Sequence, residues 1–179
     1  MNLPNKLTLL RVIMIPFFLV CLYMQTTPTR IAALVLFCAA SLTDALDGHI
    51  ARKYNLITNF GKFMDPLADK LLVCSAMIAL TSVDSAVMLP SWVVIIIIAR
   101  EFLITGFRTL AAEQNIVIAA GLWGKLKTIF QMIMIIVLLL NIDNSFFSIL
   151  SYVLIAVSLI LTIISAVDYM AKNKGVLKG

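Results

Sequence analysis

Apolar residues along the chain gather into six long runs, separated by polar or turn-forming residues. A helix needs roughly 20 residues to cross a hydrocarbon core of about 30 Å, so runs of this length predict membrane spans. We place the spans at residues 7–24, 29–43, 67–81, 91–110, 122–140 and 146–169. No internal repeat or linker interrupts them. The pattern therefore predicts one all-α domain, residues 1–179, built as an integral membrane bundle of six transmembrane helices.

Basic residues occupy alternate connections between these spans, which predicts the orientation of the bundle, because Lys and Arg collect on the cytoplasmic side. The connections on one side and the two termini carry Lys6, Arg52, Lys53, Lys62, Arg108, Lys125, Lys127, Lys172, Lys174 and Lys178. The opposite connections hold only Arg30, Asp84 and Asp143. We therefore expect both termini to face the cytoplasm.

Composition agrees with a membrane protein, since 62% of the residues are hydrophobic and only 13% are charged, against roughly 45–50% and about 25% in soluble domains. The net charge of +5 is accounted for by the cytoplasmic collar of cations, which would attract anionic membrane lipids. We therefore expect membrane lipids as partners and no nucleic acid. A cell-membrane, multi-pass location follows.

Four aspartates break the apolar pattern near the predicted cytoplasmic side. Asp44 and Asp47 are three residues apart, and Asp65 and Asp69 are four apart, so each pair shares one face of its own helix. Burying four uncompensated carboxylates would cost on the order of 10 kcal/mol. We therefore expect a compensating charge. An interfacial salt-bridge cluster that only orients helices is the plain alternative.

Hard oxygen ligands from two helices suit Mg²⁺ or Mn²⁺, and four carboxylates can hold two such ions about 3.5–4 Å apart to clamp a phosphoryl group. Gly48 and Gly61 leave backbone exposed beside the acidic positions, so a large ligand can approach. Arg52, one turn beyond Gly48, suits a phosphate oxygen. A cofactor of two divalent ions is therefore predicted.

Asn5, Thr8 and Arg11 are spaced three residues apart at the start of the first span, so they share roughly one helical face. They form either a snorkelling interfacial collar or a polar face turned toward a ligand at the cytoplasmic side. Spacing alone leaves both open.

The acidic segment resembles the complete signature of the CDP-alcohol phosphotransferases. The matching positions are Asp44-x-x-Asp47-Gly48-x-x-Ala51-Arg52, then eight residues, then Gly61-x-x-x-Asp65-x-x-x-Asp69. Within that family, the opening "PNKLTLLR", the length and the six spans resemble the bacterial phosphatidylglycerophosphate synthases. The resemblance implies transfer of the phosphatidyl group of CDP-diacylglycerol to glycerol 3-phosphate, with release of CMP, by a homodimeric enzyme.

Residue roles follow from the same resemblance. It implies that Asp44, Asp47 and Asp65 are metal ligands, and that Asp69 is in part a ligand and serves as the general base. It places the CDP-linked donor among seven further positions: Asn5, Thr8, Arg11, Gly48, Ala51, Arg52 and Gly61.

A phosphorylated acceptor requires a cationic pocket, and we expect Arg108 and Lys125 to hold its phosphate. The alternative is that these residues are ordinary positive charges of a cytoplasmic loop. Lys125 and Lys127 are two residues apart and cannot share a helix face, so we expect Lys127 to belong to the interfacial collar. Arg100 and Glu101 lie inside an apolar span, where charge is costly, so we expect them to pair or to face a cavity.

Other functions fit parts of the pattern. The same reaction type with serine or inositol phosphate as acceptor needs the same aspartates. A cation transporter also uses intramembrane acids, but these are expected near mid-membrane on broken helices, often in two related halves. A purely structural scaffold would tolerate Asp-to-Asn changes. We expect the enzyme.

Overall fold

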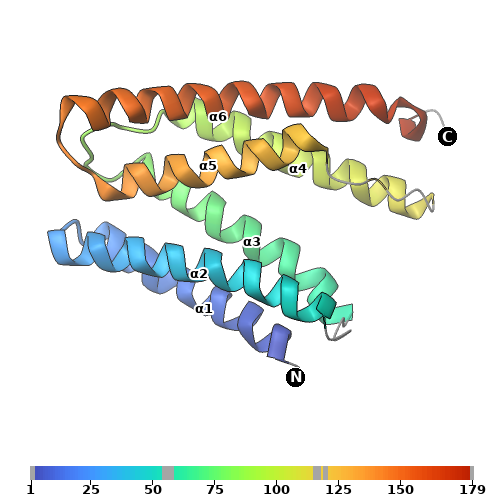
Figure 1. Ribbon diagram of the computed structural model, residues 1–179, viewed down its shortest axis with the longest axis horizontal. Coiled ribbons are helices and arrows are strands. Elements are labelled where there is room, and N and C mark those ends of the chain that lie inside the picture. The colour runs from blue at the N-terminus through green and yellow to red at the C-terminus, as the bar shows by residue number, and fades with distance from the viewer. Residues whose placement is uncertain (1–2, 54–58, 115–117, 119–120, 178–179) are drawn as a thin grey trace. The chain divides into compact units, whose positions relative to one another are not determined.

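The computed structural model describes the backbone of residues 3–53, 59–114, 118 and 121–177. Within these ranges, the side chains of residues 3–4, 44–53, 59–63, 65–66 and 176–177 lie outside the description. The described residues form six α-helices and one short 3-10 helix (Figure 1). They are α1 (Leu3–Tyr23), α2 (Thr27–Lys53), α3 (Asn59–Leu80), α4 (Ser91–Glu113), α5 (Leu122–Leu140), α6 (Ser145–Lys172) and η1 (Lys174–Leu177). An all-helical fold is thus confirmed.

Two compact units make up the chain. The first comprises Met1–Met88 with Leu138–Asn141, and the second comprises Leu89–Val137 with Ile142–Gly179. The prediction of one domain stays a prediction.

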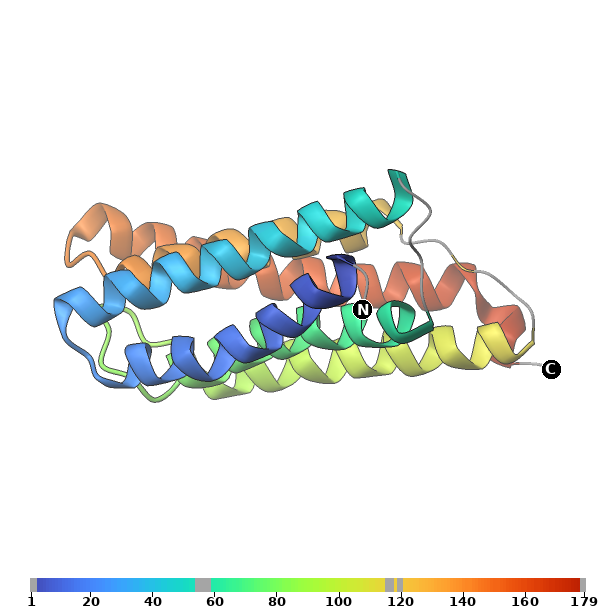
Figure 2. The same ribbon diagram turned by 90° about the horizontal axis from the view of Figure 1, so that it is seen from below.

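The first unit is built on α1, which packs against both α2 and α3. Phe18 and Phe37 are fully buried, with ring centroids 5.9 Å apart. Ala33, Ala40 and Ala68 are also fully buried, and such small residues let membrane helices approach closely. In two perpendicular views, the start of α1, the end of α2 and the start of α3 lie at the same end of this unit (Figures 1 and 2).

The second unit pairs α4 with α6. The rings of Phe107 and Tyr169 meet edge to face, with centroids 5.8 Å apart, in a cluster with Ile104 and Ala111. The face of α6 that is buried carries small hydroxylated residues, namely Ser151, Ser158, Thr162 and Ser165. Thr162 Oγ1 donates to the Ser158 carbonyl at 2.6 Å, so its hydroxyl is satisfied within the helix.

The helices begin and end close to the predicted spans, and α5 has the predicted bounds. The main difference is that α2 continues ten residues beyond Thr43 and that α3 begins eight residues before Leu67. The apolar pattern marks only the apolar part of each helix, whereas the helix itself runs on into polar sequence. Both aspartate pairs consequently lie within regular helices.

Among the described residues, three helical segments are long and apolar enough to cross a membrane: Asn5–Tyr23, Leu122–Leu140 and Ser145–Lys172. A shorter apolar segment covers Thr27–Thr43. The charged residues Arg100, Glu101 and Arg108 within α4 explain why that helix has a weaker apolar signal. Six membrane crossings and cytoplasmic termini stay predictions.

Candidate active site

The polar residues at the start of α1 are buried. Thr8 and Arg11 are fully enclosed and Asn5 is 6% exposed. This burial disagrees with an exposed snorkelling collar and favours an inward polar face. Arg11 Nε donates a hydrogen bond to the Ala40 carbonyl of α2 at 3.2 Å. The Ala40 carbonyl also accepts from Thr43 Oγ1 at 2.7 Å. Arg11 is thereby fixed one helical turn before Asp44.

The four aspartates lie on two helices of the first unit. Asp44 and Asp47 belong to the last part of α2, and Asp65 and Asp69 belong to the first half of α3. The ends of α2 and α3 that carry them lie at one end of the unit, together with the start of α1 (Figure 2).

Asp69 is the one aspartate of this signature whose side chain the structure describes. It is partly buried, next to Ala68, which is fully enclosed. The side chains of Asp44, Asp47 and Asp65 lie outside the described residues. Among the side chains that are described, no three His, Cys, Asp or Glu residues come together.

The remaining signature positions are likewise helical. Gly48, Ala51 and Arg52 belong to α2 and Gly61 belongs to α3. Their side-chain surroundings fall outside the described part of the structure. Their predicted contact with a nucleotide therefore stays a prediction.

The cations of the second unit differ sharply in exposure. Arg108 on α4 and Lys125 on α5, the predicted phosphate holders, are both exposed. Lys127, which we expected in the interfacial collar, is instead 3% exposed. Its Nζ donates to Glu101 Oε1 at 2.5 Å.

Glu101 Oε1 also accepts from Arg100 Nη1 at 3.0 Å. The expected pairing of Arg100 with Glu101 is thus confirmed, and Lys127 is the partner that the sequence analysis missed. A carboxylate between apolar residues calls for a cation as partner, but the sequence alone does not say which helix supplies it. We call Arg100, Glu101 and Lys127 the Glu101 cluster.

The chain also contains an exposed ion pair near the end of α6. Lys172 Nζ lies 2.7 Å from Asp168 Oδ1, one helical turn away. A spacing of four residues brings the two side chains together on one face of the helix. Asp168 is thereby accounted for without a chemical role.

The chain matches a known protein family along most of its length. A family model described as CDP-alcohol phosphatidyltransferase matches residues 1–164. The chain belongs to this family. The prediction made from the aspartate signature is therefore confirmed, and the chain is an enzyme of a family that is generally dependent on a divalent metal ion.

Curated relatives match along nearly the whole chain. A protein of Bacillus subtilis (strain 168), named CDP-diacylglycerol–glycerol-3-phosphate 3-phosphatidyltransferase, is 42% identical and covers 99% of this chain and 97% of its own. A protein of the same name from Rickettsia typhi (strain ATCC VR-144 / Wilmington) is 39% identical over 97% of each chain. A probable phosphatidylglycerophosphate synthase of Mycobacterium tuberculosis (strain CDC 1551 / Oshkosh) is 40% identical, over 96% of this chain and 81% of its own.

Proposed function

We propose that this membrane enzyme transfers the phosphatidyl group of CDP-diacylglycerol to sn-glycerol 3-phosphate, giving phosphatidylglycerophosphate and CMP. The observation that carries the proposal is the full-length similarity to relatives named for this reaction. The complete aspartate signature on α2 and α3 agrees with the reaction type. Both termini and the active site would face the cytoplasm of a cell membrane, and the enzyme would act as a homodimer.

Asp69 serves as the general base in this proposal. It accepts the proton of the acceptor hydroxyl while that oxygen bonds to the phosphorus of the donor, because a carboxylate within hydrogen-bond reach can take such a proton. The bond between phosphorus and the CMP oxygen breaks at the same time, and CMP leaves with that electron pair. Asp69 lies on the same helix as fully buried Ala68, so its backbone has a fixed place.

The donor set fits a divalent metal centre. Asp44, Asp47, Asp65 and Asp69 supply only carboxylate oxygens, which are the ligands that Mg²⁺ and Mn²⁺ prefer, and they come from two regular helices. We propose that they hold two such ions. Bound metal would supply positive charge to the phosphoryl oxygens and the departing CMP.

The CDP-linked donor would lie between the start of α1 and the acidic ends of α2 and α3. Asn5, Thr8 and Arg11 are buried at that end, so they can orient a ligand without competition from bulk water. Gly48, Ala51, Arg52 and Gly61 complete the proposed donor pocket. Arg52 would contact a phosphate oxygen.

The phosphate of the acceptor would be held by cations of the second unit. We propose Arg108 and Lys125 as direct contacts, both exposed and able to move toward a ligand. The Glu101 cluster carries two positive charges against one negative charge. Arg100 Nε is buried and has no hydrogen-bond partner in the part of the chain that the structure describes. The cluster would therefore add to the attraction of a phosphorylated alcohol.

Purified protein offered CDP-diacylglycerol with one acceptor at a time tests the function directly. We expect CMP release with glycerol 3-phosphate, only when Mg²⁺ or Mn²⁺ is present, and its loss on chelation. Serine and inositol phosphate should support little release. A preference for either would contradict the proposed acceptor but not the family.

Asp69→Asn tests the base. Because an amide cannot accept the proton, we expect turnover to fall by 10²-fold or more, with an unchanged thermal midpoint. Asp143→Asn, in an exposed loop, is the matched control and should retain full turnover. Normal turnover of Asp69→Asn would remove Asp69 as the base.

A further inference from the structure

A small cavity lies in the first unit at the end of α2 farthest from the aspartates. Its volume is about 130 Å³, and Thr27, Arg30, Ile31, Leu34, Leu139, Leu140 and Asn141 line it. Arg30 precedes Asp44 by fourteen residues on α2, which corresponds to about 21 Å along the helix. The cavity is therefore separate from the proposed active site.

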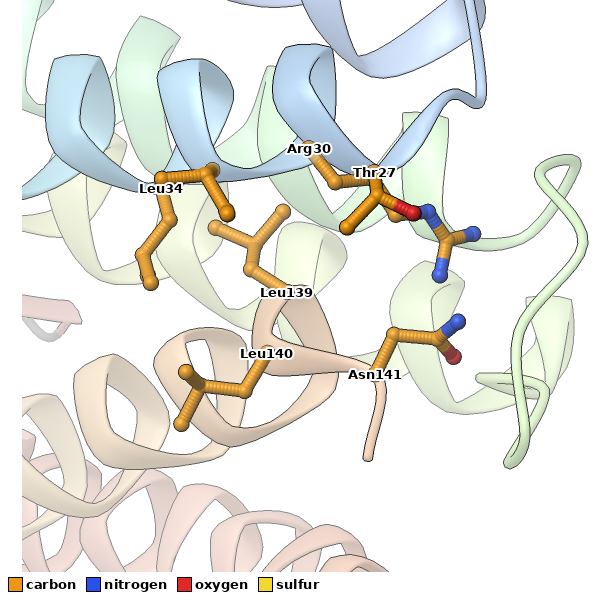
Figure 3. Close-up of a pocket in the computed structure, with 7 residues that line it drawn as sticks. Thr27, Arg30, Leu34, Leu139, Leu140 and Asn141 are labelled. Atoms are coloured by element: carbon orange, nitrogen blue, oxygen red, sulfur yellow. The ribbon is translucent and has the colours of Figure 1, made fainter. Parts of the chain in front are cut away.

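Polar and apolar side chains occupy different sides of this cavity. In Figure 3 the guanidinium of Arg30, the hydroxyl of Thr27 and the amide of Asn141 gather on one side, while Leu34, Leu139 and Leu140 lie on the other. Asn141 Oδ1 accepts a hydrogen bond from the Ala86 backbone N–H at 2.7 Å. The polar side is thereby held by the loop between α3 and α4.

Arg30 is only partly satisfied. Its Nη2 donates to the Asp84 carbonyl, whereas Nη1 is enclosed and has no hydrogen-bond partner among the described residues. An unsatisfied buried donor is costly, more so when it is charged. A guanidinium also matches the geometry of phosphate oxygens. Thr27 and Arg30 lie in the first turn of α2, where the helix dipole favours an anion.

The apolar side of the cavity is open at the surface of the first unit. Ile31 is 57% exposed and Leu140 is 42% exposed, although both are aliphatic. Their neighbour Leu139 is 2% exposed and closes the inner wall. The volume is enough for about four water-sized groups, which suits the first methylene groups of an acyl chain that continues along Ile31 and Leu140.

We propose that this cavity binds a membrane phospholipid, with its phosphodiester on Arg30 and the beginning of one acyl chain against Leu34 and Leu139. A phosphate group alone has the same chemistry as the lipid head group. The two sources differ in the apolar contact, which only the lipid makes. The apolar segment of α2 begins at Thr27, so a membrane that this segment enters would place its head groups at the first turn.

Asp84 provides an electrostatic test of the proposed lipid site. Asp84 contacts Arg30 through its backbone carbonyl, and its side chain is exposed. A negative charge at this position opposes the binding of an anionic lipid. Asp84→Asn should therefore strengthen binding of phosphatidylglycerol by a few fold, while the backbone carbonyl that holds Arg30 is retained.

Native mass spectrometry of the full chain in detergent, titrated with dioleoylphosphatidylglycerol, measures the binding. Dioleoylglycerol has the same chains without phosphate, and inorganic phosphate is the head group alone. We expect the phospholipid to bind at least tenfold more tightly than either. Arg30→Gln should weaken phospholipid binding about tenfold, since a hydrogen bond to a charged group is lost. Arg30→Lys keeps the charge without the planar fork. Its affinity for the phospholipid should lie between those of the parent protein and of Arg30→Gln.

Leu34→Trp fills the apolar side and leaves the contact between Arg30 and Asp84 in place, so it keeps the test valid if Arg30→Gln folds poorly. It should also weaken binding about tenfold. Lys172→Gln removes an exposed cation of the second unit and should change nothing. Equal affinity for dioleoylglycerol and the phospholipid, or binding of inorganic phosphate alone, would overturn the proposal. So would phospholipid affinity unaffected by Leu34→Trp in a protein that retains its thermal midpoint.

Discussion

Glu101 accepts hydrogen bonds from Arg100 of its own helix and from Lys127 of α5. It is the single negative charge of a largely buried cluster, so its removal leaves two cations in surroundings of low polarity. Losing one partner of a buried pair costs about 3–5 kcal/mol. We therefore expect Glu101→Gln to lower the thermal midpoint strongly in detergent.

The same substitution tests the proposed role of the cluster near the acceptor. Without the carboxylate, the Lys127 amine loses this charged partner and is no longer held in the same place. We expect the KM for glycerol 3-phosphate to rise about tenfold while the KM for CDP-diacylglycerol stays nearly constant. Glu101→Asp should recover part of both effects. The matched control is Glu113→Gln, which changes an exposed glutamate at the end of α4. An equal rise in the KM for glycerol 3-phosphate in this control would contradict the proposed role of the Glu101 cluster.

Single residues show where sequence reasoning succeeds and where it stops. The pairing of Lys172 with Asp168 was predictable because a spacing of four residues brings two side chains together on any helix. The partner of Lys127 was not, because it depends on which faces of α4 and α5 meet. The burial of Arg11 against Ala40 has the same origin. Spacing gives the face of a helix, and only tertiary packing decides what that face meets.

Helix α6 begins with a side-chain cap. The Oδ1 atom of Asn144 accepts a hydrogen bond from the Phe146 backbone N–H at 3.0 Å, which satisfies one of the donors left open at a helix start. Asn144→Ala should destabilise the protein by about 1 kcal/mol. The thermal midpoint should fall by about 2–4 °C.

Two substitutions at the same position check this explanation. Asn144→Asp and Asn144→Ser keep an oxygen acceptor at the cap, so both should stay within about one degree of the parent protein. Turnover should be unaffected in all three variants, because the cap is remote in sequence from the aspartate signature. Equal destabilisation by Asn144→Ser and Asn144→Ala would mean that the hydrogen bond at Phe146 does not stabilise α6.

At the scale of elements, the apolar pattern predicted six helices and the structure contains them. The ends of α2 and α3 were less predictable, because the helices continue into the charged sequence around the aspartates. Apolar periodicity reports contact with lipid or core and carries no signal for a polar helical turn. The family signature identified the residues in that stretch, and their helical spacing agreed with it.

The arrangement of the whole chain in the membrane follows from its charges and can be tested by labelling. The positive-inside rule predicts that Asp84 and Asp143 lie outside the cell and that Lys174 lies inside. All three residues are exposed, so a cysteine at each position should react with a maleimide. The test needs a background in which Cys21, Cys38 and Cys74 are replaced by Ala.

In intact cells, a membrane-impermeant maleimide should label Asp84→Cys and Asp143→Cys, and it should label Lys174→Cys only after permeabilisation. Along the sequence, helices α4 and α5 come between Asp84 and Asp143. Two crossings by these helices would return the chain to the same side of the membrane. One crossing by α6 then separates Asp143 from Lys174. Labelling of Asp143→Cys and Lys174→Cys from the same side would contradict α6 as a span. Labelling with the sides exchanged would keep the spans but place the aspartates outside the cell, where the donor CDP-diacylglycerol could not reach them from the cytoplasm.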